Sequence, residues 1–360
     1  MKILDWYIVK KYLSSFVFII LAMTLIIVVF DVSERVDKFV ENNAPLKEIV
    51  VDYYANFVPY LMSMFSGLFA FIAVIFFTSK MAGHTEFVAM LSSGVSYRRV
   101  LRPYLMVATL IAVANIYLSN FVIPAAGQKR YEFEKKYVQR QFFNTERHIH
   151  RQTQLNSFAY IETFNVRDQR AARFSVETIV DGKLLHKLTS DYAIWDTTQN
   201  LWRVYNYVER TITDSGEVVH RGTEMDTVIN LTGQDLSVRV NKLVETMSYR
   251  ELNDYIAMLR LQGVISGVKL AQIEKHKRFA SPMASIILTL IGVCLSSRKV
   301  RGGMGLHIGL GVGLSFGYIL FQRFSEMFVQ ANALPAAIAL WIPNILFLLV
   351  GLWLYAKTQK

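Results

Sequence analysis

The chain has 360 residues, of which 53% are hydrophobic, and a formal net charge of +11. A cationic excess of this size is compatible with nucleic-acid binding. Here, however, the cations gather in short stretches beside long apolar runs. Membrane topology alone explains that placement, so we exclude nucleic acid as a partner. Cys294, the one cysteine, lies inside an apolar run, so it cannot crosslink the polar part of the chain.

Six stretches without Asp, Glu, Lys or Arg form two triplets, one in each half of the chain. A helix needs about 20 apolar residues to cross the hydrocarbon core, and one charge at mid-span costs about 2.5–3.5 kcal/mol on the insertion scale. Each stretch meets the length requirement without a charge. We therefore predict six transmembrane helices, three before and three after a polar insert. The stretches are residues 12–30, 53–79, 103–128, 279–297, 302–322 and 327–356.

The charges between these runs predict the orientation of the chain. Lys and Arg concentrate in both tails and in the second and fourth loops, whereas the first loop is mainly acidic. By the positive-inside rule, both termini are then cytoplasmic and residues 125–278 lie outside. We expect the first run to be a retained membrane helix, because an acidic stretch, and not a cleavage site, follows it. The cations are Lys2, Lys10, Lys11, Lys80, Arg98, Arg99, Arg102, Arg298, Lys299, Arg301, Lys357 and Lys360.

The polar insert has the pattern of a β domain. Alternation of period two occurs in 158–162, 173–179 and 202–209, and turn signals lie at 181–182, 198–200 and 214–216. Ser248 and Glu251 form a possible capping box before apolar residues at helical spacing. We predict an α-helical membrane protein with an inserted all-β, jelly-roll-like domain. The expected domains are transmembrane helices 1–3 (1–128), the β domain with helical linkers (129–278) and transmembrane helices 4–6 (279–360).

Sequence signatures of catalysis are missing. The chain has no G-x-x-x-x-G-K-[ST] loop to hold phosphates and no H-E-x-x-H or Cys/His metal-binding pattern. His148 and His150 lie in a polar stretch that is typical of a solvated surface. We predict a non-catalytic protein without cofactor or metal, and we expect any ATP hydrolysis to occur in a separate subunit.

The loop between the second and third runs contains a short amphipathic segment. Thr85 could cap a helix from Glu86 to Leu91, and Gly94 could end it. Phe87, Met90 and Leu91 would then share one apolar face. Two interpretations stay open on these residues alone: a helix lying on the bilayer, or a docking helix for a cytoplasmic partner.

The chain resembles the permease subunits of the lipopolysaccharide exporter, the LptF/LptG (YjgP/YjgQ) family, because several motifs occur in the same order over its whole length. Within the family, the resemblance to the G-type subunit is slightly closer than to the F-type. The strongest motif is the 85–94 loop, which is similar to that family's S-E-hydrophobic-hydrophobic-x-M-x-x-x-G pattern. The motifs are Leu4-Asp5-Trp6-Tyr7-Ile8, the segment 85–94, Pro124, Phe158-Ala159-Tyr160-Ile161-Glu162, the helix 252–263, Phe279 and Pro282.

The resemblance implies a permease subunit in the bacterial inner membrane. Such a subunit belongs to an ATP-driven exporter that extracts lipopolysaccharide from the outer leaflet. The implied partners are a cytoplasmic ABC ATPase dimer, a second permease (most often a paralogue) and a periplasmic bridge protein. Glu86, with Phe87, Met90 and Leu91, would couple the chain to the ATPase. A non-transporting scaffold or sensor with a ligand-binding β domain is the alternative.

The resemblance also implies where the substrate lies, because the first and fifth spans act as gates in this family. Lipid A carries anionic phosphates at headgroup height, so cations are expected at the outer rim and apolar side chains deeper. The family's G-type often has a lysine near the outer end of span one, where this chain has Asp31. Either Arg35 and Lys38 take that role, or the substrate or partner arrangement of this chain differs. Glu34 and Glu326 would pair with Arg35 and Arg323 when the cavity is empty. The candidate substrate-binding residues are Arg35, Lys38, Lys129, Arg130, Arg323, Phe30, Phe316 and Leu320.

Overall fold

The computed structural model of the chain describes residues 3–138, 147–213, 216–237, 240–297 and 303–358. The chain divides into two compact units. One comprises residues 1–138, 245–249 and 272–360, and the other comprises residues 139–244 and 250–271. The first is helical and the second contains the sheet. The division differs by several residues from the expected boundaries at 128 and 278, because helical structure continues past the third apolar run.

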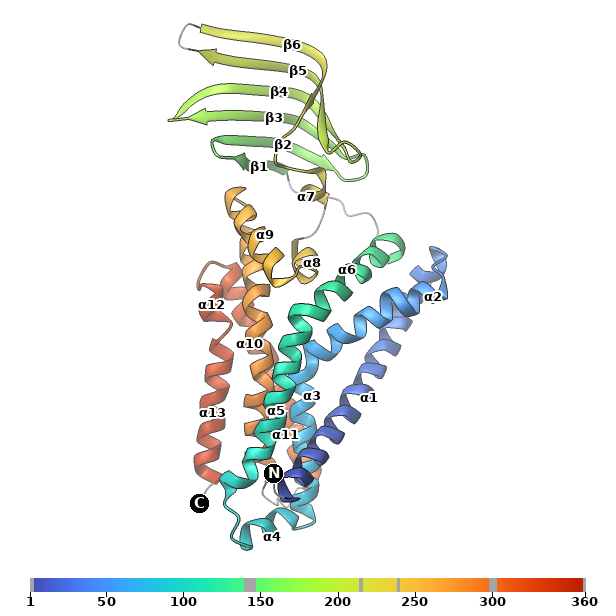
Figure 1. Cartoon of the computed structure of the whole chain (residues 1–360), viewed down its shortest axis with the longest axis vertical. Helices are drawn as coiled ribbons and strands as arrows, with labels where there is room; N and C mark the ends of the chain where they lie inside the picture. Colours follow the sequence, from blue (N-terminus) through green and yellow to red (C-terminus); the bar gives the residue numbers. More distant parts are fainter. Residues whose placement is uncertain (1–2, 139–146, 214–215, 238–239, 298–302, 359–360) are drawn as a thin grey trace. The chain divides into compact units, whose positions relative to one another are not determined.

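Helices account for both ends of the chain. The helices are α1 (Ile3–Glu41), α2 (Leu46–Glu48), η1 (Ile49–Tyr54), α3 (Ala55–Gly83), α4 (Glu86–Ser92), α5 (Tyr97–Tyr117), η2 (Leu118–Val122), α6 (Ile123–Phe133), η3 (Glu134–Val138), α7 (Gly233–Ser237), α8 (Val240–Glu245), α9 (Tyr249–Leu261), α10 (Ile265–Ser296), α11 (Gly303–Gln330), α12 (Ala336–Ala339) and α13 (Ile342–Thr358). In the helical unit, α4 and both chain ends lie at the same end (Figure 1).

Five helical stretches in the described residues are long and apolar enough to cross a membrane. They are Ile3–Glu41, Leu46–Gly83, Tyr97–Val138, Ile265–Ser296 and Ala336–Thr358. Each overlaps one of the predicted runs, but the last begins at Ala336, whereas residues 327–330 of the predicted run 327–356 belong to α11. The remaining predicted span corresponds to α11, a 28-residue helix that is not among the five. A sixth span therefore stays a prediction.

The helical unit is packed around α3, which contacts α1, α5, α6 and α11. Phe71 and Ile75 are almost fully buried on this helix. Glycines on α3 and on the neighbouring α10 allow the close approach. A Cβ atom added at Gly292 would lie 2.9 Å from the Phe71 ring, and one at Gly67 would lie 3.0 Å from Ala284 Cβ. Small residues at an interface allow membrane helices to approach one another closely.

A π-helical turn interrupts the third long helix. The turn η2 joins α5 to α6 just before Pro124. Proline has no N–H and its ring clashes with the carbonyl four residues earlier, so the α-helical hydrogen-bond ladder cannot continue through it. The π-helical turn, which contains Ser119 and Asn120, joins the two α-helical segments into one continuous helix.

The sheet unit contains six antiparallel strands whose spatial order is the order in the chain (Figure 1). They are β1 (Arg147–Gln154), β2 (Ser157–Asn165), β3 (Arg170–Val180), β4 (Lys183–Asp196), β5 (Leu201–Thr213) and β6 (Gly216–Thr227). The three predicted strand segments lie in β2, β3 and β5, which confirms them. A jelly roll consists of two Greek keys. The described strands form a single meander, so the jelly roll is not confirmed.

Left-handed backbone marks the predicted turns. Asp181 and Gly182 have φ values of 50° and 78° between β3 and β4, and Asn200 has a φ of 54° between β4 and β5. Glycine, asparagine and aspartate tolerate this region best, which is why they signal turns. The third predicted turn includes residues 214 and 215, which lie outside the described residues.

One face of the sheet is apolar and covered. Trp202 is fully buried and stacks on Phe174 with 5.3 Å between ring centroids. Its indole Nε1 donates a hydrogen bond of 2.7 Å to the carbonyl of Leu231, in the segment that follows β6. Gly233 packs so closely that an added Cβ would lie 2.7 Å from Trp195 Cγ. The segment from 229 to 237 thus shields the aromatic face from water.

Candidate functional site: a charged pocket among the helices

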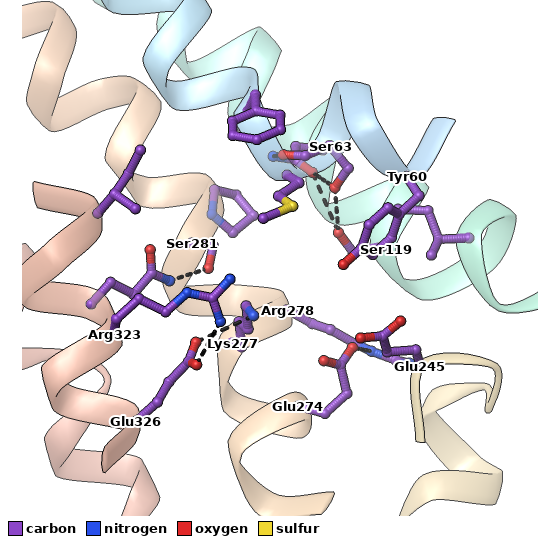
Figure 2. Close-up of a pocket in the computed structure, with 17 residues that line it drawn as sticks. Tyr60, Ser63, Ser119, Glu245, Glu274, Lys277, Arg278, Ser281, Arg323 and Glu326 are labelled. Carbon is purple, nitrogen blue, oxygen red and sulfur yellow. Dashed lines mark hydrogen bonds and ion pairs between the residues drawn. The ribbon is translucent and has the colours of Figure 1, made fainter. Parts of the chain in front are cut away.

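The helical unit holds a pocket of about 110 Å³ that is lined by α3, the α5–η2–α6 helix, α10 and α11 (Figure 2). Its wall combines apolar side chains with charged and hydroxyl groups. The lining residues are Tyr60, Ser63, Met64, Phe65, Asn115, Ser119, Ile123, Glu245, Glu274, Lys277, Arg278, Ser281, Pro282, Ile319, Gln322, Arg323 and Glu326.

Helix α10 contributes one charged stripe to this pocket. Glu274, Lys277, Arg278 and Ser281 recur at spacings of three and four, so they share one face of the helix. Arg278 Nε donates to Glu274 Oε1 at 2.9 Å, and the Arg278 side chain is only 3% exposed. Because an isolated buried charge is very costly, this guanidinium depends on its carboxylate partner.

Helix α11 faces that stripe with an acid and a base. Arg323 Nη1 donates to Glu326 Oε2 at 2.9 Å, and Lys277 Nζ lies 3.2 Å from Glu326 Oε1. Figure 2 shows Lys277 and Arg323 converging on the carboxylate of Glu326 from two helices. Glu326 is buried, whereas half of the Arg323 side chain is exposed. One carboxylate therefore pairs with a cation of its own helix, Arg323, and joins α11 to α10 through Lys277.

Hydroxyl and amide groups form the opposite wall. Asn115 Nδ2 donates to the carbonyl of Ser63 at 3.1 Å, and the Ser63 hydroxyl donates to the Asn115 side-chain oxygen. The Ser63 and Ser119 hydroxyls lie 3.1 Å apart. Ser119 lies in the π-helical turn η2. These bonds hold α3 to α5 and keep the wall polar in an otherwise apolar bundle.

The charged groups of the pocket are paired with one another in this structure. Its cations Lys277, Arg278 and Arg323 are opposed by carboxylates, so an entering anion has to replace Glu326 or Glu274 as their partner. In a partly desolvated pocket such charge-assisted contacts are about twice as strong as neutral hydrogen bonds. The arrangement suits the recognition of an anionic group such as phosphate.

The predicted cations on α1 occupy different surroundings. Arg35 Nε donates to Asp31 at 2.8 Å, and its guanidinium lies 5.5 Å from the centre of the Tyr53 ring. The expected partner, Glu34, is exposed and adjacent in sequence, whereas Asp31 lies one turn back on the same face. The predicted Glu34–Arg35 pair is thus replaced by Asp31–Arg35. Lys38 is exposed.

The other predicted substrate residues divide into exposed and enclosed groups. Lys129 is exposed on α6. Arg130 lies over the rings of Phe57 and Tyr60, at 5.3 and 4.8 Å, and 3.7 Å from the pocket residue Glu245. The apolar candidates Phe30, Phe316 and Leu320 are 72%, 56% and 56% exposed.

The predicted helix in the loop is present as α4, with Gly94 just beyond it at a φ of 85°. Thr85 does not cap it: its backbone is left-handed with a φ of 61°, and its hydroxyl donates to the His84 carbonyl. The predicted apolar face is also divided. Phe87 is 1% exposed and packs into the helical core, while Leu91 is 38% exposed.

The sequence prediction missed the α10 half of the pocket. Glu274, Lys277 and Arg278 stand at helical spacing directly before the charge-free run that begins at 279. Arg323 and Glu326 flank the end of another run in the same way. Charges at i, i+3 and i+4 beside two apolar runs were the signal that could have marked these residues as candidates, although it does not show that the two sets face each other.

Comparison with known proteins links this architecture to a transport family. A family model described as "Lipopolysaccharide export system permease LptF/LptG" matches residues 6–357. The lipopolysaccharide export system permease protein LptG of Escherichia coli strain K12 is 20% identical over 361 residues, with 97% of this chain and 98% of the relative covered. LptG of the O6:H1 strain of the same species matches with the same figures.

Proposed function

Because the chain belongs to the LptF/LptG family of lipopolysaccharide export permeases, we propose that it is the membrane subunit of an ATP-driven lipopolysaccharide extractor. The family and the apolar helices together make it a multi-pass inner-membrane permease. In our proposal both termini are cytoplasmic, six helices span the membrane, and the sheet unit is periplasmic. The alternating Lys and Arg excess supports this orientation.

The observation that carries the proposal is the charged pocket. Lipopolysaccharide is an amphiphile with anionic phosphates at headgroup height. We propose that a lipid A phosphate replaces Glu326 as the partner of Lys277 and Arg323, with Arg278 behind them. Glu326 then neutralises the two cations again when the lipid leaves. An exchange of partners of this kind makes binding reversible, which a transporter needs.

The remaining predicted residues take supporting roles in this proposal. Arg35, Lys38, Lys129 and Arg130 form a cationic outer rim. The exposed side chains of Phe30, Phe316 and Leu320 offer apolar surface to acyl chains on the gate helices α1 and α11. Asp31 holds Arg35 until a phosphate competes for it.

In this proposal, ATP hydrolysis is coupled to the permease through α4. A separate cytoplasmic ABC ATPase dimer docks on the helix, where Glu86 meets a basic group and Met90 and Leu91 provide apolar contact. Phe87 is enclosed by the chain's own core, so its role is to anchor α4 rather than to contact the ATPase. A second permease, most simply a paralogue, completes the cavity. The sheet unit passes the lipid to a periplasmic bridge protein.

Reconstitution tests the proposal. We expect the complex of this chain with a partner permease and its ATPase, in proteoliposomes, to hydrolyse ATP faster when lipopolysaccharide is present and to release the lipid to a soluble acceptor. Lys277→Ala should weaken photocrosslinking of the lipid about tenfold, the effect of losing one charge-assisted contact. The matched variant Lys47→Ala, at an exposed lysine, should not. An ATPase rate that does not respond to lipopolysaccharide would favour a non-transporting scaffold.

A further inference from the structure

The opening motif of the chain makes specific contacts with the helix that follows α3. We propose that Tyr7 is a positioning residue that clamps α4 to the end of α1, so that a movement of α4 is transmitted to α1. This inference rests on the proposed function, because it concerns how the ATPase drives the gate helix. The proposed function gives the motif Leu4-Asp5-Trp6-Tyr7-Ile8 no role, and this inference assigns one to it.

The clamp contains a hydrogen bond to the coupling acid itself. The Tyr7 hydroxyl donates to Glu86 Oε2 at 2.9 Å. A carboxylate has about four acceptor positions, so this bond orients Glu86 while leaving it able to meet a cation from outside. A hydrogen bond to a charged group is among the stronger ones that a side chain can make. Tyr7 therefore fixes the acid that the proposed ATPase contact requires.

A second polar contact holds the same end of α1 to α5. Arg99 Nη2 lies 2.6 Å from Asp5 Oδ2, and the Asp5 side chain is 7% exposed. Asp5 and Tyr7 are two positions apart on a helix, which turns their side chains about 200° from each other. The end of α1 is thus held by α4 on one side and by α5 on the other.

Apolar packing completes the clamp. Phe87 is 1% exposed, meets the edge of the Tyr97 ring at 6.0 Å and shares a core cluster with Ile8 and Tyr12. The Tyr12 hydroxyl lies 2.7 Å from the Thr289 hydroxyl on α10. The polar contact of α4 therefore ends on the first turns of α1, and Phe87 joins α4 to a core cluster that α1 shares with α3 and α5.

Beyond this clamp, α1 is sparsely covered by its own chain. Phe18, Leu25 and Phe30 are 71%, 66% and 72% exposed along the same helix. A continuous helix of 39 residues behaves as a rod about 58 Å long. The far end of α1 is also held, because Phe39 is buried against Tyr53 and Phe133. Held near both ends and exposed along its middle, α1 can transmit a movement of α4 along its length. That is the mechanical requirement for a gate helix driven from its cytoplasmic end.

The experiment compares two Tyr→Phe variants in the full reconstituted complex. Tyr7→Phe keeps the ring and removes only the hydroxyl. Tyr117→Phe is the matched control at a tyrosine that is 59% exposed. The quantity measured is the number of ATP molecules hydrolysed per lipopolysaccharide released. We expect Tyr7→Phe to raise this ratio about tenfold, which is the effect of losing one hydrogen bond to a charged group. Tyr117→Phe should leave it at the wild-type value.

A double-mutant cycle then tests whether Tyr7 acts through Glu86. Glu86→Ala, which removes the acceptor, should also raise the ratio, and Tyr7→Phe should add little in the Glu86→Ala background. If the double variant raises the ratio by the product of the two single effects, the clamp is overturned. It is also overturned if Tyr7→Phe hydrolyses as few ATP molecules per lipopolysaccharide released as the wild type. Loss of the ATPase from purified Tyr7→Phe complex would show a purely structural role and would also overturn it. A wild-type complex that releases no lipopolysaccharide would instead refute the proposed function.

Discussion

Glu326→Gln should strengthen binding of the anionic substrate and weaken the fold at the same time. The wild-type carboxylate lies 3.2 Å from Lys277 Nζ and 2.9 Å from Arg323 Nη1. At an effective dielectric constant of about 20, each contact corresponds to a gross Coulomb attraction of about 5 kcal/mol, most of which desolvation offsets. Arg323 is half exposed, so its share is reduced further by solvent.

A phosphate entering the wild-type pocket has to replace this carboxylate, whereas glutamine presents no competing charge. Recovering as little as 1.4 kcal/mol of the attraction would raise the affinity about tenfold. Stability should fall by about 2–3 kcal/mol. This is less than for full removal of a buried partner, because glutamine still accepts a hydrogen bond. The slower release of lipid should lower the transport rate.

Titration of the purified complex with lipid A measures the affinity, and thermal unfolding measures the stability. Glu41→Gln is the matched control, since Glu41 is an exposed acid on α1. A folded Glu326→Gln variant whose affinity for lipid A is unchanged or lower would refute the exchange of partners. A control variant with the same gain in affinity would show that net charge alone is responsible.

Three further changes test other parts of the molecule. Trp202→Phe should destabilise the sheet unit by about 2–4 kcal/mol, because it leaves a gap and removes the donor to the Leu231 carbonyl; faster hydrogen exchange in β4 and β5 would reveal the loss. Asp31→Asn weakens an acceptor shared by Arg35, Tyr53 and Tyr54, so a spin label at exposed Val40 should become more mobile. Unchanged mobility of the label would show that these contacts of Asp31 do not hold the end of α1. The backbone N–H groups of Thr198 and Gln199 hold the pKa of Asp196 below its usual range. Its stabilising effect is therefore present above about pH 4 and lost as the pH falls through the lowered pKa; Asp196→Ala should lower the melting temperature at pH 7 more than at pH 3.

The long helices could be predicted because the cost of burying charge acts on every residue of a run. Charge-free runs such as 53–79 correspond directly to helices such as α3. The alternation in 158–162 likewise reports a sheet with two different faces, although the buried residues are Ala159 and Ile161 and not Phe158 and Tyr160. Both signals are local, so one sequence suffices to detect them.

The pocket and the clamp depend on which helices pack together, and local patterns do not carry that information. Nothing in the spacing of Arg323 and Glu326 identifies Lys277 as their partner across the helix interface. Phe87 illustrates the same limit: three apolar residues at helical spacing predict an apolar face but not what covers it. Local alternation identifies strands but does not report their order in the sheet. For this reason a jelly roll was expected where the described strands form a meander.

The meander has a consequence for how the protein is made. Every strand pairs with its neighbours in the chain, so the loops that must close are short and the contact order of the sheet is low. Hairpins of this kind form within microseconds, much faster than ribosomes add residues. The sheet can therefore assemble hairpin by hairpin while α10 to α13 are still being synthesised. In this order of events, the last helices insert into the membrane behind a domain whose strands are already paired.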